Sequence, residues 1–181
     1  AGKIAIIENE IGKTGVDDQF IADQGLDVRE IFGGCVCCSL GVNLLTTLKA
    51  LEDEHAADVV IVEPSGVAAP DMVRQLLTGY DGHIESTRIL VLFDIERFRA
   101  LSAVARPYME SSIDAADVVV INKIDLARDG EVADLVDQIH QRRPGVKIVT
   151  LSARQGANFD KLTAALADDA EPACDCGHDH H

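Results

Sequence analysis

Three cysteines lie within four residues of one another, at Cys35, Cys37 and Cys38. Thiolate sulfur is a preferred ligand of zinc and of its borderline-soft neighbours, and a Cys-x-Cys-Cys spacing places three thiols on one short turn. Gly33 and Gly34 directly precede the first thiol and give the backbone the freedom to turn the thiols inward. Three protein ligands leave one position of a tetrahedral site open, so the pattern predicts a site that can take up and release a metal ion.

Two other interpretations of these cysteines stay open. One is a redox pair formed by Cys37 and Cys38, and the other is a buried, inert patch. Thiolate ligands do not by themselves distinguish one transition metal from another. We favour zinc, and cobalt, nickel and copper(I) are the alternatives.

A second polar cluster follows the continuous apolar run at residues 118–121 and consists of Asn122, Lys123 and Asp125. In doubly wound folds ligands bind outside the carboxyl ends of the strands, where these side chains are expected. The Asp125 carboxylate can accept hydrogen bonds from N1 and the exocyclic amine of guanine, a pair that adenine does not present. Asn122 can brace the loop and contact the base, and the Lys123 stem can cover the ring face. This spacing matches the N-K-x-D motif of P-loop GTPases.

A further loop supports this interpretation. Ser152 and Ala153 follow the last apolar run and are similar to the S-A-K/L loop that packs on the other side of the guanine. A surface turn is the alternative, because Asn and Asp are common turn residues. Two matching loops, each after an apolar run, favour a guanine site.

Short apolar runs alternate with helical patterns along the whole chain. Continuous rather than alternating apolar runs are typical of parallel strands that are covered on both faces. The pattern predicts an α/β fold with a doubly wound, mostly parallel sheet. Strands are expected at residues 3–7, 59–62, 89–93, 118–121 and 146–149, and helices at 44–54, 71–77, 96–114, 130–142 and 158–167, with Pro107 breaking or kinking the third helix.

We expect one domain over residues 1–167, followed by a flexible acidic tail over residues 168–181. The tail contains Cys174, Cys176 and His178, which are metal ligands at suitable spacing. It can collect metal for the inner cysteines, or its terminal histidines can be the remainder of a purification tag.

The composition excludes several classes of partner. A formal net charge of −15, without a basic stripe, argues against binding to nucleic acid or to an anionic membrane. No apolar run approaches the roughly 20 residues of a membrane helix, and we see no signal peptide. The odd number and tight spacing of the five cysteines do not suit a secreted disulfide framework, so we expect a cytoplasmic protein.

A phosphate-binding loop is absent from the sequence. A GTPase needs G-x-x-x-x-G-K-[ST] to cradle the phosphates, and the Gly-Lys-Thr at residues 12–14 has Ile7 where the first glycine belongs. We therefore expect the chain to lack the first strand, the Walker A loop and the first helix of a P-loop NTPase. Truncation is the favoured explanation, and loss of the loop, and with it catalysis, is the alternative.

Four segments, taken in order, resemble the CobW-like proteins, which are P-loop GTPases related to HypB and UreG. They are residues 6–17 (E-N-E-F-G-x-x-G-I-D in the family), 33–38 (G-C-x-C-C), 62–67 (I-E-P/T-S-G) and 122–125 (N-K-x-D). The likeness covers roughly residues 3 to 160. The usual C-terminal domain of the family is not part of it, so we expect a short form.

The resemblance implies a GTP-dependent metallochaperone that delivers a transition metal to a client protein. It implies GTP or GDP and Mg²⁺ as ligands, with Glu63 ordering Mg²⁺ through water and Gly66 donating its N–H to the γ-phosphate. Glu8, Glu10 and Asp17 would lie in a switch-like segment close to Mg²⁺ or the metal. By analogy with relatives, a homodimer around nucleotide is expected. The alternatives are a non-catalytic metal-binding or sensor module that keeps a guanine pocket, and a thiol redox protein.

Overall fold

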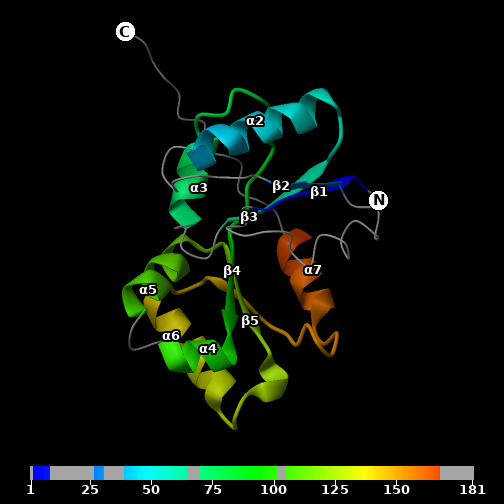
Figure 1. Ribbon diagram of the computed structural model, residues 1–181. Coiled ribbons are helices and arrows are strands. Elements are labelled where there is room, and N and C mark those ends of the chain that lie inside the picture. The colour runs from blue at the N-terminus through cyan, green and yellow to red at the C-terminus, as the bar shows by residue number, and fades with distance from the viewer. Residues whose placement is uncertain (1, 9–26, 31–38, 65–69, 102–104, 168–181) are drawn as a thin grey trace. The chain divides into compact units, whose positions relative to one another are not determined.

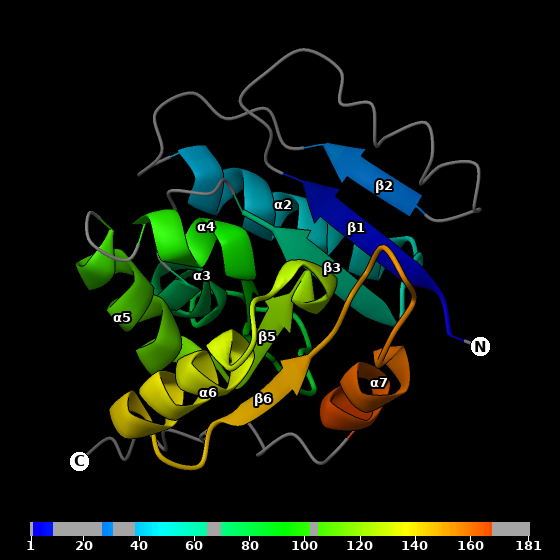
Figure 2. The same cartoon turned by 90° about the horizontal axis from the view of Figure 1, so that it is seen from below.

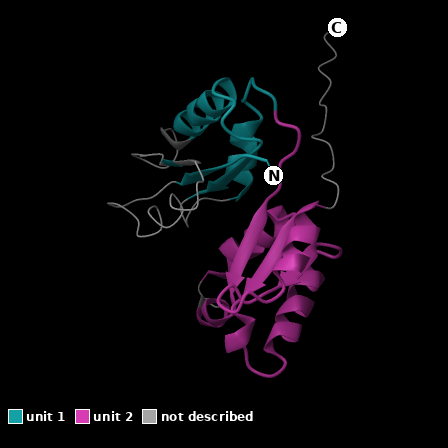
Figure 3. Cartoon of the chain, turned by 90° about the vertical axis from the view of Figure 1, so that its right-hand side faces the viewer, with its two compact units in different colours: residues 1–83 teal, residues 84–181 magenta. Residues whose placement is uncertain are grey.

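The computed structural model describes residues 2–8, 27–30, 39–64, 70–101 and 105–167. The chain divides into two compact units, Ala1–His83 and Ile84–His181 (Figure 3). Each unit has its own parallel sheet and its own apolar core. The single domain expected over residues 1–167, and the separate tail, stay predictions.

Unit 1 is built on a three-stranded parallel sheet with the strand order β2-β1-β3. The helices of its described residues accompany the sheet (Figure 1). The elements are β1 (Ile4–Glu8), β2 (Asp27–Glu30), α2 (Ser39–Asp53), β3 (Val59–Glu63) and α3 (Pro70–Leu77).

The core of unit 1 lies on one face of this sheet. Leu44, Leu48 and Leu51 recur at the spacing that places them on one face of α2. They pack with Ala5 and Ile7, alternate residues of β1 that point to the same side of the sheet. Leu44 and Leu51 are almost completely buried, so this contact anchors the helix to the sheet.

Unit 2 also contains a three-stranded parallel sheet, with the order β4-β5-β6. Its helices alternate with the strands along the chain. The elements are β4 (Leu90–Asp94), α4 (Ile95–Leu101), α5 (Arg106–Ala115), β5 (Val118–Asn122), the 3₁₀ helix η1 (Ile124–Leu126), α6 (Glu131–Arg142), β6 (Lys147–Thr150) and α7 (Phe159–Ala167).

Both faces of the unit 2 sheet are covered, because successive residues of β5 point to opposite sides. Val119 and Ile121 pack with residues of α5 and α6 on one side. Val118 and Val120 belong to a second cluster, which Leu162 of α7 joins on the other side. Figure 2 shows α7 and the α5–α6 layer on opposite sides of β5 and β6. The predicted α/β architecture with parallel strands is confirmed.

Most strand and α-helix boundaries agree with the prediction within one residue, and the larger differences are the following. Strand β2 was not predicted, because its sequence Asp-Val-Arg-Glu has one apolar residue. Helix α2 begins at Ser39 rather than at residue 44. The helix predicted over residues 96–114 is two helices, α4 and α5, and Pro107 occupies the first turn of α5, where its missing N–H removes no helical hydrogen bond.

No helix among the described residues is both long enough and apolar enough to cross a membrane.

Candidate functional site

The carboxyl ends of the unit 2 strands bring the predicted guanine-binding residues to one edge of the sheet. Asn122 is the last residue of β5 and is the register partner of Asp94, the last residue of β4. Ile121 is the register partner of Thr150 at the end of β6. The loops that follow β5 and β6 are therefore neighbours, although about thirty residues separate them in the sequence.

Asn122 joins these two loops through a single side-chain oxygen. Its Oδ1 accepts a hydrogen bond from the backbone N–H of Lys123 at 2.7 Å and another from the backbone N–H of Ala153 at 3.0 Å. The backbone N–H of Ile124 donates to the carbonyl of Leu151 at 3.3 Å and adds a second link between the loops. These hydrogen bonds, which we call the two-loop clamp, hold the loop after β5 against the loop after β6.

Lys123 adopts the left-handed backbone conformation, with φ of 63° and ψ of 36°. This conformation costs a residue with a Cβ roughly 1 kcal/mol or more. Such strain persists where the surroundings enforce it, and it is concentrated at functional sites. The Asn122 side chain contributes to that enforcement by binding the Lys123 N–H.

Asp125 and Ser152 form a third link between the loops. The Ser152 hydroxyl donates to Oδ1 of Asp125 at 2.5 Å, and it accepts a hydrogen bond from the backbone N–H of Gln155 at 3.3 Å. Ser152 is completely buried. Its backbone also exchanges two hydrogen bonds with Ala157. The hydroxyl thus has a fixed direction, and it orients the carboxylate that is predicted to read the base.

Within the described part of the chain, no hydrogen bond or ion pair reaches the other oxygen of Asp125, Oδ2. Asp125 lies in the first turn of η1 and is partly exposed. The Asp125 carboxylate is therefore oriented through Oδ1, and its Oδ2 can accept hydrogen bonds from a ligand that offers N–H donors.

Asp94 is a member of this edge that the sequence analysis missed. Its Oδ2 pairs with Nζ of Lys123 at 2.6 Å. Its Oδ1 accepts from the backbone N–H groups of Glu96 at 2.9 Å and Arg97 at 3.4 Å, at the start of α4. The hydrogen bond from Lys123 lowers the pKa of the Asp94 carboxyl, and desolvation opposes this effect. The signal was available, since Asp94 directly follows an apolar run.

In unit 1 the structure brings two of the predicted acidic residues together. Glu8 and Glu63 are register partners at the carboxyl ends of β1 and β3. Glu30, at the end of β2, is the register partner of Glu8 on its other side. Oxygen ligands of this kind suit Mg²⁺. Among the described residues no group of three or more His, Cys, Asp or Glu side chains is arranged to hold a metal ion.

The remaining predicted site residues lie outside the described residues. They are Glu10, Asp17, Cys35, Cys37, Cys38, Gly66, Cys174, Cys176 and His178. Their roles as ligands therefore stay predictions.

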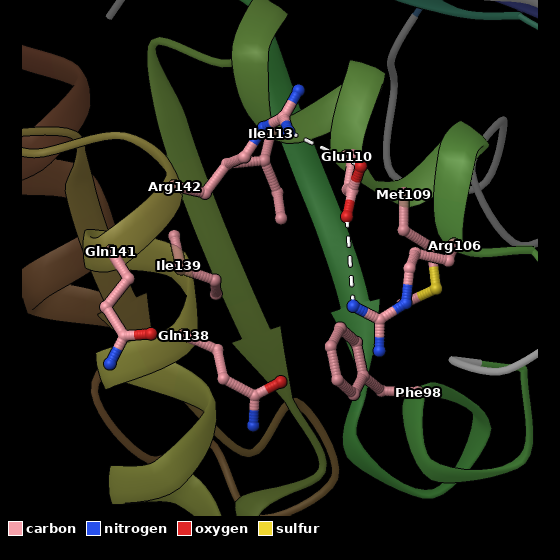
Figure 4. A pocket seen from close by; sticks show the side chains of 9 residues that line it. All are labelled: Phe98, Arg106, Met109, Glu110, Ile113, Gln138, Ile139, Gln141 and Arg142. Atoms are coloured by element: carbon pink, nitrogen blue, oxygen red, sulfur yellow. Dashed lines mark hydrogen bonds and ion pairs between the residues drawn. The ribbon is translucent and has the colours of Figure 1, made fainter.

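A cavity of about 280 Å³ lies elsewhere in unit 2, between α4, α5 and α6 (Figure 4). Apolar side chains of Phe98, Met109 and Ile139 are among those that line it. Its two arginines, Arg106 and Arg142, both pair with Glu110. None of the predicted site residues lines this cavity, so we assign the candidate site to the strand ends instead.

Parallel strands with helices between them, and polar loops at the carboxyl ends of the strands, are the arrangement of α/β domains that bind ligands at that edge. The chain belongs to the family of CobW/HypB/UreG nucleotide-binding domains, whose family model matches residues 1–150. The family resemblance seen in the sequence is confirmed.

Curated relatives include two from Escherichia coli strain K12. The zinc chaperone YeiR is 31% identical over 125 residues, which are 68% of this chain and 38% of the relative. The zinc chaperone YjiA is 30% identical over 152 residues, which are 78% of this chain and 47% of the relative. The chain thus spans less than half the length of these relatives.

Two solved structures share the fold. HypB from Archaeoglobus fulgidus, a hydrogenase maturation factor, has a TM-score of 0.64 at 16% identity and covers 91% of this chain and 74% of its own. HypB from Helicobacter pylori, crystallised in complex with nickel, has a TM-score of 0.60 at 17% identity, with 91% and 73% covered. At these identities the likeness supports the fold alone.

Proposed function

We propose that the protein is a cytoplasmic, guanine-nucleotide-dependent metallochaperone. Asn122, Lys123, Asp125, Ser152 and Ala153 bind the guanine base. A Cys35–Cys37–Cys38 loop binds a transition metal, and GTP binding and hydrolysis govern its delivery to a client protein. The observation that carries the proposal is the two-loop clamp, in which Asn122 binds the N–H of Ala153 and Ser152 orients Asp125.

The chemistry of the clamp supports guanine over adenine. Oδ2 of Asp125 and the remaining lone pairs of its carboxylate accept from N1–H and the exocyclic amine of guanine. Adenine has no N–H at N1, so the carboxylate would face a lone pair there. A buried acceptor left without its donor costs binding free energy, which gives the site its preference.

The metal part of the proposal is supported by the family and by the cysteines. The named relatives include zinc chaperones, and three clustered thiolates are a donor set that zinc prefers. We therefore favour Zn²⁺ as the cargo, with Co²⁺ and Ni²⁺ as the alternatives. Cys174, Cys176 and His178 are candidates for a first collection site.

The part of the proposal that concerns GTP hydrolysis rests on the acidic residues at the carboxyl ends of the unit 1 strands. Carboxylate oxygens fit Mg²⁺, and Glu63 would hold it through water, with Glu8, Glu10 or Asp17 nearby. Gly66 would donate its backbone N–H to the γ-phosphate. When bound, Mg²⁺ neutralises charge that develops on the phosphates. GTP would draw these segments together and close the cysteine loop, and release of phosphate would relax them.

The base site is tested by titrating the full-length protein with nucleotides. Asp125→Asn replaces one acceptor oxygen with an N–H donor, which matches the 2-oxo group of xanthine rather than the amine of guanine. We expect affinity for GDP to fall by about a hundredfold and affinity for xanthosine diphosphate to rise, in titrations with each nucleotide.

The matched control is Asp129→Asn. Asp129 is an exposed acid in the turn after η1, and this variant makes the same change of charge. It should leave both affinities unchanged. If the two variants behave alike, or if the wild-type protein binds no guanine nucleotide, the assignment of the base site is wrong.

The coupling is tested by measuring Zn²⁺ affinity with GDP and with a non-hydrolysable GTP analogue, beside a Cys35/Cys37/Cys38→Ser variant. The proposal expects different affinities in the two nucleotide states and loss of binding in the variant. Equal affinities would leave a metal-binding module that is not coupled to nucleotide. Reversible oxidation without metal uptake would indicate a thiol redox protein.

A further inference from the structure

The Asp94–Lys123 ion pair joins the end of β4 to the base-reading loop across an interval of twenty-nine residues. We infer that Asp94 is a positioning residue of the guanine pocket, which fixes the ammonium of Lys123 so that the lysine stem is held ready to cover the base. This inference rests on the proposed function, because it assigns a role within the same base site.

Asp94 is itself rigidly placed. It ends β4 in register with Asn122, the residue directly before Lys123. Its Oδ1 is occupied by two backbone N–H groups at the start of α4, so the carboxylate cannot rotate without losing them. Its Oδ2 then points at Nζ of Lys123 at 2.6 Å. The strand end and the helix start together orient one oxygen toward the lysine.

The exposure of the two side chains agrees with these roles, in which Asp94 holds the lysine ammonium and the Lys123 stem covers the base. The Asp94 side chain is 19% exposed and the Lys123 side chain 44% exposed. The acid is therefore mostly enclosed, while much of the lysine remains at the surface. With the backbone fixed by its left-handed turn and the ammonium fixed by Asp94, both ends of the aliphatic stem are constrained.

Such constraint matters because lysine has a long, flexible side chain. Ordering it only when the base arrives would cost conformational entropy, which weakens binding. A side chain that is already held in place avoids that cost, which is the general advantage of preorganisation. Asp94 would therefore raise nucleotide affinity without touching the atoms that distinguish guanine from other purines.

The competing interpretation is that Asp94 only caps α4. Asp94→Asn separates the two roles, because asparagine is an equally good cap and keeps Oδ1 as an acceptor. Its amide group replaces Oδ2 with a donor, which faces the Lys123 ammonium and cannot bind it. The variant therefore removes the anchor and retains the cap.

The experiment measures GDP and IDP affinity of the complete gene product for wild type, Asp94→Asn, Lys123→Met and the double variant. Methionine keeps an apolar stem and removes the ammonium. We expect Asp94→Asn to weaken GDP binding about two- to fivefold, the size expected for one partly exposed ion pair. In the Lys123→Met background the same change should have no further effect.

Two readouts distinguish positioning from general damage. The ratio of GDP to IDP affinity should stay as in wild type, since IDP lacks only the exocyclic amine that Asp125 reads. The melting temperature of Asp94→Asn should match that of Glu131→Gln. This control removes a different ion-paired carboxylate of unit 2, the partner of Arg99, and it should leave GDP affinity unchanged.

Three results would overturn the inference. One is an unchanged GDP affinity in Asp94→Asn, and another is an equal loss in the wild-type and Lys123→Met backgrounds. The third is a changed GDP-to-IDP ratio together with a lowered melting temperature, which indicates a structural role. If the wild-type protein binds no guanine nucleotide, the proposed function fails and this inference fails with it.

Discussion

The two units use the same parallel β-strand pattern and differ in how their strands are packed. In unit 2, four consecutive residues of β5 are no more than 1% exposed, from Val118 to Ile121, because helices cover both faces of the sheet. In unit 1, the described residues pack on one face, and Val59 and Ile61 on the other side of β3 are 53% and 50% exposed. The predicted base-reading loops belong to the unit whose sheet is covered by helices on both faces.

This difference explains how the hydrogen bonds of the two-loop clamp around Asn122 keep a fixed geometry. Its hydrogen bonds join loops from two strands, so their geometry depends on the relative position of those strands. Buried apolar residues on both faces of β5 fix that position, since protein cores resist even small changes in volume. A site that reads a base through hydrogen bonds requires such a rigid support.

The largest expected effect compares one isoleucine from each unit. Ile121→Ala removes a completely buried side chain of β5 and should lower the free energy of unfolding of unit 2 by about 3 kcal/mol, through lost burial and the cavity left behind. Ile61→Ala removes a half-exposed side chain of β3 and should cost about 1 kcal/mol or less. Amide hydrogen exchange, resolved by peptide, measures both units separately. Equal losses would show that the exposed face of β3 is covered in solution and would remove the contrast.

The next effect concerns a cationic cap found in unit 2. The Arg143 guanidinium donates to the backbone carbonyls of Ile113, Asp114 and Ala116, where α5 ends and the chain leads into β5. Arg143→Ala should destabilise unit 2 by about 1–2 kcal/mol, because these carbonyls lose a charged donor near the helix C-terminus.

Arg97→Ala is the control for the cap, because Arg97 is an exposed arginine of the same unit on α4. Denaturant midpoints of the two variants measure the difference. A loss in Arg97→Ala as large as that in Arg143→Ala would contradict the role of the cap.

The smallest effect depends on pH and belongs to unit 1. The Glu52 carboxylate accepts hydrogen bonds from the backbone N–H of His83, the hydroxyl of Tyr80 and the ammonium of Lys49, and these bonds lower its pKa to about 2. A lowered folded-state pKa stabilises the fold above the ordinary value of 4.5, and the contribution disappears as pH falls from there toward 2.

Glu52→Gln should therefore flatten the loss of unit 1 stability between about pH 4.5 and pH 2, as measured by thermal melting at several pH values. Asp53→Asn is the control. Asp53 is the neighbouring, more exposed acid, and it pairs with the same lysine. The account of Glu52 is refuted if both variants give the wild-type pH dependence.

The Tyr80 hydroxyl makes the stabilisation from the same hydrogen-bond network depend on pH at high pH as well. Burial and the hydrogen bond to Glu52 raise the pKa of Tyr80 to about 12. This contribution is complete below the ordinary value of 10.0 and is lost as pH rises through about 12. Unit 1 should therefore be destabilised at both extremes of pH by groups that meet at one carboxylate.

Much of the fold could be predicted because the patterns that indicate strands and helices lie within short stretches of the sequence. Continuous apolar runs marked five strands, and the strand-end rule directed attention to Asn122 and Asp125. Strand β2 could not be predicted in this way, since its four residues include only one apolar side chain and its pairing with β1 specifies it as a strand. The cysteine ligands and Gly66 lie outside the described residues, so those assignments remain predictions.

The amino-acid sequence by itself determined most of the strands and helices in their order, the family and the residue types available at the base site, because apolar runs and short motifs are properties of neighbouring residues. Only the tertiary structure decided that Asp94 pairs with Lys123, that Ser152 orients Asp125 and that one sheet is covered on both faces. Those features join residues about thirty positions apart. Their geometry follows from the packing of β4, β5 and β6 side by side, which no single stretch of sequence contains.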